Sequence, residues 1–597
     1  MTSFSRLVIS ITLLAAGVAV LAQTPPKKPT SKAQANRGAD IKARQEQASS
    51  LLLALATDAR SFRDLNLRAR SLANIANLMW ELDRYQSRAL FAKAWEAAEV
   101  AERESKEPVN IREEILGLVA RRDRDLAERF LESLKSIQTE DEQAEVSRNS
   151  LWGPSEALQK RLDLARNLLM AGDIKRALEF AEPALGTATI STLEFLTLLR
   201  KHDAPAADRF YASMLGHAPS GPEAANTISL LSSYLFTPHM YVMFTSDGHA
   251  ETSWREEAFG PINVDPQLRL NFFQFAAGVL LQPIPNSKMN QDASALVIRY
   301  MVSQRLSPLF EQFAPASLAT SLRSQLAALR ELISEDVRSA ENEWVRKGIG
   351  SESEEYKDRE QTMLDQIERA KTSSERDELY LQLAVHALEK NKTTARDYAD
   401  KIADSDLRKT VLAWVDWASA LRAVEEKKSD TALALVRKGE LTHIQRVWIL
   451  TQVAGLIAKT DRDNALTTIN DAIAEVGRID NSDPDRPRGL FAIANALQGL
   501  DAVRAWEIAF DAVKAGNAAE SFTGEDAVLI LGLRSSTQIF NRRDPNPDFD
   551  VKGIFGKLAA VDANRTIELA RAFQGEGPRA IATIAIAKAL LSSETRP

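Results

Sequence analysis

The stretch AGLIAKTDRDNALTTI, residues 454–469, carries the spacing that decides the fold. Ala454, Ile457, Asp461, Ala465 and Ile469 follow one another at steps of three, four, four and four residues. Such steps place side chains on one face of a helix, and an aspartate between two apolar runs suits a turn or a helix N-cap. The stretch therefore predicts two antiparallel helices joined by a short turn.

The same spacing recurs along the chain and is densest in residues 380–513. The other copies have their central residue at Asp83, Asp123, Asp203, Asn391, Lys428, Asp501 and Gly577. A single helical hairpin cannot bury its own apolar face, so neighbouring hairpins must stack. We therefore expect an all-α fold, an α-α superhelical solenoid of stacked antiparallel helical hairpins.

One unit, residues 158–186, is the most recognisable. Its pattern is Ala165, Leu168, Gly172, Asp173, Ala177, Ala181 and Ala184. These residues resemble the tetratricopeptide repeat, although Ala181 replaces the usual aromatic residue and Thr189 stands near the expected proline. The resemblance implies a superhelical scaffold that binds peptides or proteins along a groove, and it implies no chemistry.

The N-terminus is typical of export. Residues 1–22 have a basic start at Arg6 and an apolar run that ends in small residues, as in a signal peptide. An uncleaved membrane anchor is the alternative, but the run is shorter than the roughly 20 apolar residues that span a bilayer. Residues 23–44 form a Pro/Lys-rich linker. We expect a periplasmic or secreted protein with no stable membrane span after signal cleavage.

Composition excludes several classes of protein. The chain of 597 residues contains no cysteine, which excludes disulfides and thiolate metal sites. Removing residues 1–22 removes one base and no acid, so the net charge of −7 becomes −8. This mildly acidic balance argues against a nucleic-acid partner.

The rest of the chain divides by composition into five regions. They are N-terminal helical repeats at 45–233, an aromatic irregular insertion at 234–267, long helices at 268–347, a charged hinge region at 348–377, and C-terminal helical repeats at 378–597.

Residues 238–266 contain the candidate ligand-binding residues. Aromatic residues, turn formers and histidines gather there while helical periodicity lapses, which predicts a long irregular loop. The candidates are His239, Tyr241, His249 and Trp254. A packed insertion that covers a helix end is the simpler alternative. The histidines lack the spacing of helical metal ligands, so no metal site is predicted.

Two other features have a functional and a structural interpretation. Trp414 and Trp417 share a helix face and could stack on a sugar, although packing between repeats explains them better. Residues 544–550 imitate the alternating oxygens of a calcium loop, but Phe549 stands where the glycine belongs. A plain turn is the alternative there.

No catalytic or cofactor motif is present. The sequence lacks His-Glu-x-x-His, Gly-x-Ser-x-Gly and the phosphate-binding Gly-rich loop. We therefore name no catalytic residue and expect no cofactor. The leading hypothesis is a non-enzymatic scaffold that binds a protein or peptide in the bacterial cell envelope. The alternatives are an α/α-barrel enzyme acting on polysaccharide or cell-wall glycan, and a purely structural envelope protein.

Overall fold

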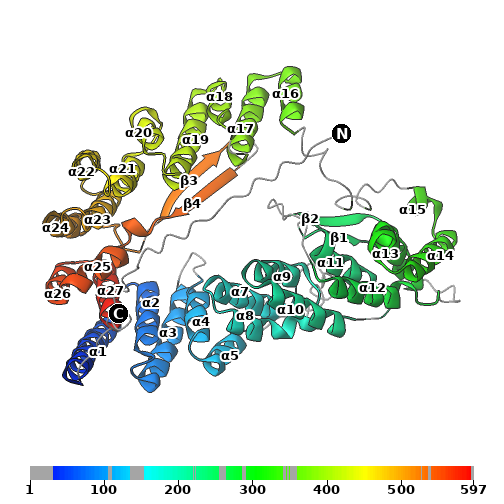
Figure 1. The fold of residues 1–597 in the computed structure, drawn as a ribbon, viewed down its shortest axis with the longest axis horizontal. Coiled ribbons are helices and arrows are strands. Elements are labelled where there is room, and N and C mark those ends of the chain that lie inside the picture. The colour runs from blue at the N-terminus through cyan, green and yellow to red at the C-terminus, as the bar shows by residue number, and fades with distance from the viewer. Residues whose placement is uncertain are drawn as a thin grey trace, which may run out of the picture.

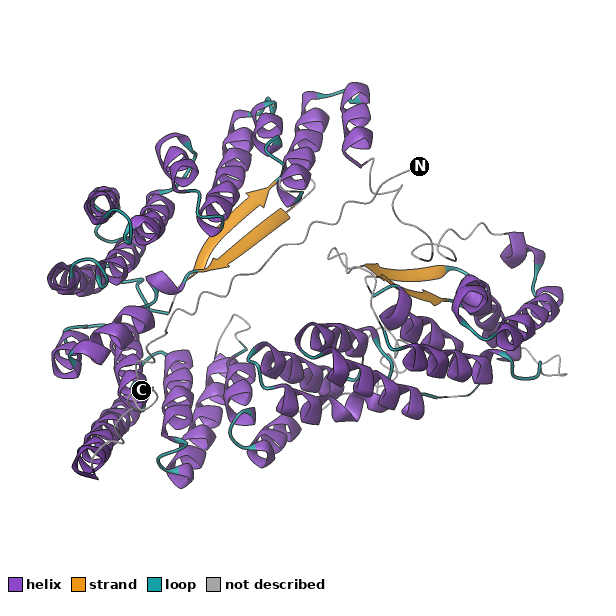
Figure 2. Cartoon of the chain, viewed as in Figure 1, coloured by secondary structure: helices purple, strands orange, loops and turns teal. Residues whose placement is uncertain are grey.

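A computed structural model describes most of the chain beyond the N-terminal segment. It covers residues 31–104, 110–134, 154–219, 221, 224–238, 240–254, 264–284, 291–339, 345, 349, 359–390, 392–525, 528–535 and 539–592. Helices dominate these ranges, and they form two arms that curve around a central space (Figures 1 and 2). The all-α solenoid expected from the repeat spacing is confirmed. Within the described residues, no helix is long and apolar enough to cross a bilayer.

The described helices from α1 to α15 make the N-terminal arm. In order they are α1 (Ser31–Ala59), α2 (Leu65–Met79), α3 (Arg84–Glu104), α4 (Ile111–Ala120), α5 (Arg124–Ser133), α7 (Glu156–Met170), α8 (Ile174–Ala181), the 3₁₀ helix η1 (Glu182–Gly186), α9 (Ile190–His202), α10 (Ala204–His217), α11 (Ala225–Phe236), α12 (Pro266–Leu280), α13 (Gln291–Phe313), α14 (Ala316–Leu332) and α15 (Glu335–Ser339). Helices α2, α4, α7 and α9 line the inner side of this arm, and α5, α8 and α10 lie outside them (Figure 1).

The remaining helices make the C-terminal arm. They are α16 (Arg359–Arg369), α17 (Ser373–Glu389), α18 (Ala395–Asp400), α19 (Ser405–Glu425), α20 (Ser429–Lys438), α21 (His443–Ile457), α22 (Arg462–Val476), α23 (Asp485–Leu497), α24 (Ala502–Ala518), the 3₁₀ helix η4 (Pro547–Phe549), α25 (Val551–Val561), α26 (Ala563–Arg571) and α27 (Glu576–Ser592). Helices α17, α19, α21 and α23 face the central space, and α18, α20, α22 and α24 lie behind them (Figure 1).

A recurring aspartate caps the second helix in seven of the helix pairs that the structure describes. In each, the carboxylate accepts the backbone N–H three residues later, and the seven are Asp83, Asp123, Asp173, Asp203, Asp461, Asp501 and Asp562. This bond satisfies an amide that has no partner within the helix. The small residues around it, such as Ala454, Ala465 and Ala505, are fully buried, so the backbones of paired helices approach closely.

The predicted central residue is wrong in one copy and makes no cap in another. Lys428 lies in the turn directly before α20, as predicted, but its side chain makes no capping bond. Gly577 lies inside α27 rather than in the turn before it. A glycine suits that place because a Cβ would lie 2.6 Å from the backbone oxygen of Thr523. Asn391 lies outside the described residues.

The irregular loop predicted at residues 238–266 is replaced in part by a β-hairpin. Strand β1 (Met240–Phe244) pairs antiparallel with β2 (Ala250–Trp254). Gly248 takes a positive φ of 84° in the turn, a conformation that glycine adopts without strain. Every residue of β1 is buried, so this strand belongs to the core of the N-terminal arm.

A second hairpin interrupts the C-terminal repeats. Strands β3 (Val528–Arg534) and β4 (Ile539–Pro545) pair antiparallel and cross the inner side of the C-terminal arm (Figure 2). Leu533 packs in one core cluster with Trp414, and Leu529 packs in another with Trp417. The hairpin thus lies as an extended segment along the inner ends of the repeats.

The two ends of the chain close against each other. Helix α27 packs on α1 and α2. The amide of Gln47 donates to Asn564 Oδ1 at 3.0 Å, and the backbone N–H of Arg63 donates to Glu576 Oε2 at 3.1 Å. One continuous core cluster includes Leu52 of α1 and Ile581 of α27. The first and last helices therefore complete one curved body. We call the region where α27 meets α1 and α2 the junction; it lies at the lower left of Figure 1.

Candidate functional site

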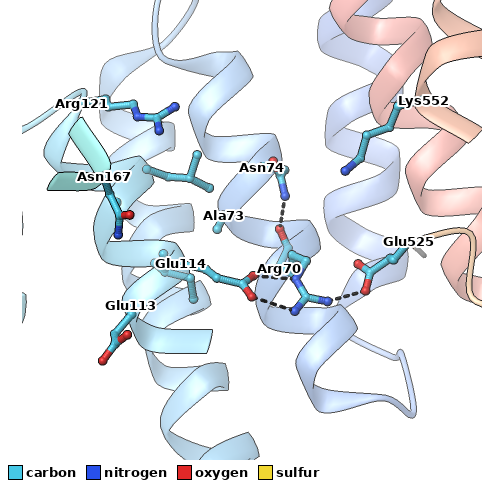
Figure 3. Close-up of a pocket in the computed structure, with 12 residues that line it drawn as sticks. Arg70, Ala73, Asn74, Glu113, Glu114, Arg121, Asn167, Glu525 and Lys552 are labelled. Atoms are coloured by element: carbon cyan, nitrogen blue, oxygen red, sulfur yellow. Dashed lines mark hydrogen bonds and ion pairs between the residues drawn. The ribbon is translucent and has the colours of Figure 1, made fainter. Parts of the chain in front are cut away.

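A polar pocket of about 600 Å³ opens where the two arms meet (Figure 3). Its lining comprises Arg70, Ala73, Asn74, Glu113, Glu114, Ile115, Gly117, Leu118, Arg121, Asn167, Glu525 and Lys552. Helices α2, α4 and α7 supply one wall, and the segment before β3 together with α25 supplies the other. The pocket is therefore assembled from opposite ends of the sequence.

Arg70 holds the two walls together. Its guanidinium binds Glu114 in a bidentate manner, with Nε–Oε2 and Nη2–Oε1 distances of 2.7 and 3.1 Å. Its remaining nitrogen, Nη1, donates to Glu525 across the junction. The planar fork of arginine suits this double contact, because separate nitrogens serve separate carboxylates.

Glu525 is positioned by a tight turn against α27. The preceding Gly524 has a φ of 77°, and a Cβ there would lie 3.0 Å from Pro578 Cα. Glycine is therefore required for both the backbone conformation and the close approach. The backbone N–H of Glu525 also donates to Thr523 Oγ1 at 3.2 Å, so the carboxylate emerges from an ordered turn.

Burial and charge act against each other in this ion pair. Burial raises the pKa of Glu525, and the neighbouring Arg70 offsets the effect only in part. Burial disfavours the charged guanidinium of Arg70 and by itself would lower the pKa of Arg70. The hydrogen bond with Glu114 and the charge of Glu525 outweigh this effect, so the pKa of Arg70 is raised. The ionised form of Glu525 thus depends on the positive charge of Arg70 to offset the cost of burying its own charge.

Three exposed charged side chains of the lining are not used in this network. Glu113, Arg121 and Lys552 make no ion pair with any residue in the described ranges. Asn74 and Asn167 add neutral amides to the same wall. The charged and amide groups of the lining suit the recognition of a ligand that carries both charges.

A second opening of about 650 Å³ lies at the far end of the C-terminal arm, between α17, α19 and the end of β3. Three of its four acidic residues, Asp377, Glu378 and Asp404, have structural partners. Asp377 accepts the backbone N–H groups of Ala403 and Asp404 at 2.7 and 3.0 Å. Ser535 donates to Glu378 Oε1 at 2.7 Å, which ties the end of the hairpin to α17.

Of the four candidate ligand residues named from the sequence, the three that the structure describes do not line the junction pocket. Tyr241 lies on β1 with 1% of its surface exposed, so it is part of the core. His249 is in the hairpin turn with 83% of its side chain exposed. Trp254 ends β2, and His239 lies outside the described residues. Conversely, sequence reasoning missed Arg70 and Glu525, which no local motif marks.

The other two features singled out from the sequence have structural roles. Trp417 is fully buried, and its indole N–H donates to Asp544 Oδ2 at 2.6 Å, so it offers no exposed ring to a sugar. Asp548 accepts hydrogen bonds from Gln452 and Asn495 at 2.7 and 2.6 Å. The acidic residues of 544–550 thus fasten the hairpin and η4 to the inner helices.

Comparison with known proteins adds little to this geometry. No protein-family model matches the chain, and no curated protein matches it. One solved structure, described as a circular tandem repeat protein with novel repeat topology and enhanced subunit contact surfaces, aligns over 92% of this chain and 96% of its own. The identity is 13% and the TM-score is 0.14, so the likeness carries no argument about function.

Proposed function

We propose that this protein is an exported, non-enzymatic helical-repeat scaffold that binds a protein or peptide in the bacterial cell envelope, on the inner side of its two arms. One observation carries the proposal. The inner side of the C-terminal arm already holds an extended segment, the β3–β4 hairpin, which buries Leu529 and Leu533 against the repeats. A surface built to hold extended chain in this way suits an extended segment of a partner as well.

The junction pocket supports the same proposal. Arg121, Lys552 and Glu113 present both charges at its mouth, and the two asparagines supply neutral donors and acceptors. A polypeptide offers matching groups along its backbone and side chains. The partner therefore engages the pocket through charged and amide groups rather than through a deep apolar anchor.

The proposal includes export of the protein and the type of helical repeat. The signal-peptide pattern of residues 1–22 supports a mature chain in the periplasm or outside the cell. The unit at 158–186 is a helix–turn–helix with Gly172 at a φ of 84° and Asp173 as the N-cap of α8, which supports the proposed likeness to a tetratricopeptide repeat. We assign the repeats to that type of scaffold.

The arrangement of carboxylates favours binding over hydrolysis. A glycan hydrolase needs one carboxylic acid and one carboxylate free to reach the substrate. In the pocket, Glu114 and Glu525 both accept hydrogen bonds from Arg70, which leaves Glu113 as the only unpaired carboxylate of this lining among the described residues. The enzyme alternative therefore has no specific support from this site.

Site-specific photo-crosslinking tests the proposal. A photoreactive amino acid would replace Arg121 in the pocket or Asn541 on β4, and, as outer controls, Tyr85 on α3 or Phe510 on α24, which are 86% and 48% exposed. We expect both inner positions to yield an adduct with the same envelope protein in whole bacterial cells, and the outer positions to yield none. Equal adducts from all four positions, or none from the inner pair, would contradict the proposal.

A further inference from the structure

The outer edge of β1 is closed by side chains of α11. Asn226 Nδ2 donates to the backbone oxygen of Phe244 at 2.8 Å, and the N–H of Phe244 donates back to Asn226 Oδ1 at 2.9 Å. Ser229 Oγ donates to the backbone oxygen of Val242 at 2.6 Å. Because these groups point away from β2, the contacts leave β1 with no edge for another strand.

The edge of β2 has no such closure. Val242 is opposite Thr252 and Phe244 is opposite Ala250. The backbone groups of Val242 and Phe244 turn away from β2, and in an antiparallel pair the residues opposite them then turn their own N–H and C=O groups away from β1. Thr252 and Ala250 therefore direct their backbone groups outward, and no other part of the described chain hydrogen-bonds to them there.

Among the described residues, none is hydrogen-bonded to this edge, and Ala250 and Thr252 are partly exposed. Strand β1 packs against α11 and α13, so β2 is the strand farther from these helices, and it lies toward the space between the arms (Figure 2). Natural proteins usually protect an edge strand with lysine, proline or a bulge. Residues 250–254, Ala-Glu-Thr-Ser-Trp, contain neither lysine nor proline, and their pairing with β1 is regular.

The charges beside the edge select one kind of strand. Glu251 lies within β2 and is exposed, and Asp247 in the adjoining turn is exposed too. Asp247 accepts hydrogen bonds from the Thr245 hydroxyl and from the His249 N–H, and these lower its pKa, the hydroxyl having the larger effect. Opposite charges directly across two strands stabilise their pairing, so a basic residue fits opposite Glu251.

From this geometry we propose that β2 is a strand-addition site, which takes an extended, basic segment of a partner protein as the third strand of the β1–β2 sheet. The proposal rests on the proposed scaffold function and names how the partner is held. Backbone hydrogen bonds to Ala250 and Thr252 provide affinity, and the acidic side chains provide selectivity. It also gives a role to the hairpin that carries His249 and Trp254.

The test uses the full mature chain and a labelled peptide of about ten residues that alternates lysine and threonine. Its ligand controls are a peptide alternating glutamate and threonine, and the lysine peptide with alternate backbone nitrogens methylated. Thr252→Pro removes an outward N–H, while Thr252→Val keeps the backbone and the strand preference. Affinities are measured by fluorescence anisotropy, and amide exchange of residues 245–254 by mass spectrometry.

We expect the lysine peptide to bind and to slow amide exchange in β2. The methylated peptide and the Thr252→Pro variant should each bind about tenfold more weakly, because hydrogen bonds to the edge are lost, and Thr252→Val should bind as the wild type does. The melting temperature of each variant reports whether the hairpin still folds, and the exchange measurement on the wild type needs no variant.

Two results would overturn strand addition. One is the absence of peptide binding, and the other is binding that leaves the exchange of β2 unchanged. If crosslinks from Arg121 and Asn541 persist in either case, strand addition fails while the scaffold function stands. If those crosslinks are also absent, the scaffold function itself fails.

Discussion

Arg70 on α2 and Glu525, 455 positions later in the sequence, form an ion pair across the junction of the two arms. The same guanidinium binds Glu114 on α4, so one side chain connects the second helix, the fourth helix and the segment before β3. This relationship explains why the pocket exists only in the closed chain. Its lining is complete once α27 has packed on α1 and α2.

Replacing Arg70 with alanine should destabilise the folded chain by about 1–2 kcal/mol, because the partly buried carboxylate of Glu525 and the exposed carboxylate of Glu114 lose their partner. The side chains of Arg70 and Glu525 are 26% and 27% exposed, so solvent moderates the cost. Arg70→Lys keeps the charge but loses the two-pronged contact, and it should fall between the wild type and Arg70→Ala. Urea unfolding measures the difference, and equal stability of all three proteins would refute the role given to Arg70.

Glu525 should give the protein a specific pH dependence. Burial raises its pKa in the folded state above the ordinary value of 4.5. A carboxyl whose pKa is raised in the folded state binds its proton more tightly there, so its ionisation opposes folding. This free-energy cost of ionisation is absent below pH 4.5 and grows as the pH rises through the folded pKa. Compared with Glu525→Gln, the wild type should therefore gain relative stability as the pH falls toward 4.5. Melting temperatures that differ by a constant amount across this range would contradict the shift.

The capping aspartates should each contribute to stability. Asp461→Ala removes the bond to the N–H of Asn464, 3.0 Å long, and should cost about 1 kcal/mol. Asp461→Asn serves as the matched control, because an asparagine oxygen caps a helix about as well. Thermal unfolding of the two variants side by side measures the effect. An alanine variant as stable as the asparagine variant would mean that the cap is not the reason for the repeated aspartate.

The β3–β4 hairpin should depend on Asp544, which accepts hydrogen bonds from the Trp417 indole and from Arg542. Asp544→Ala leaves the buried indole N–H without a partner and should cost about 1–3 kcal/mol. Asp544→Asn keeps an acceptor oxygen and should cost less. Equilibrium unfolding in urea provides the comparison, and the fastening role would be excluded by an alanine variant with unchanged stability.

The repeats and their turns could be predicted because the relevant interactions are local. The spacing of Ala454, Ala465 and Asp461 reports which residues share a helix face and which one begins the next helix. The structure buries both alanines and uses the aspartate as an N-cap. The β1–β2 hairpin had a local signal as well, the Asp247-Gly248 turn between two short runs that favour strands. The aromatic and turn-forming composition of the region led instead to the prediction of an irregular loop.

The junction and the inner hairpin had no such signal. The bond between Trp417 and Asp544 joins residues 127 positions apart, and the pair of Arg70 and Glu525 spans most of the chain. Periodicity reports which face of a helix is buried, but it does not report which distant element buries it. The candidate pocket therefore depends on how the whole solenoid curves, and its residues are ordinary surface positions when read one helix at a time.

The closure of the chain is the central claim, and the absence of cysteine makes a direct measurement possible. Gln47 on α1 and Asn564 on α26 are hydrogen-bonded at 3.0 Å through their side-chain amides, so a short bifunctional thiol crosslinker should join the two cysteines of the double variant Gln47→Cys/Asn564→Cys within one chain. Gln47→Cys/Ile539→Cys is the control, because Ile539 pairs with Arg534 at the end of the hairpin that Ser535 ties to α17, in the C-terminal arm. We predict rapid crosslinking within the monomer for the first pair and none for the second. Failure of the first pair to crosslink, or crosslinks only between chains, would contradict the closed solenoid and the pocket that depends on it.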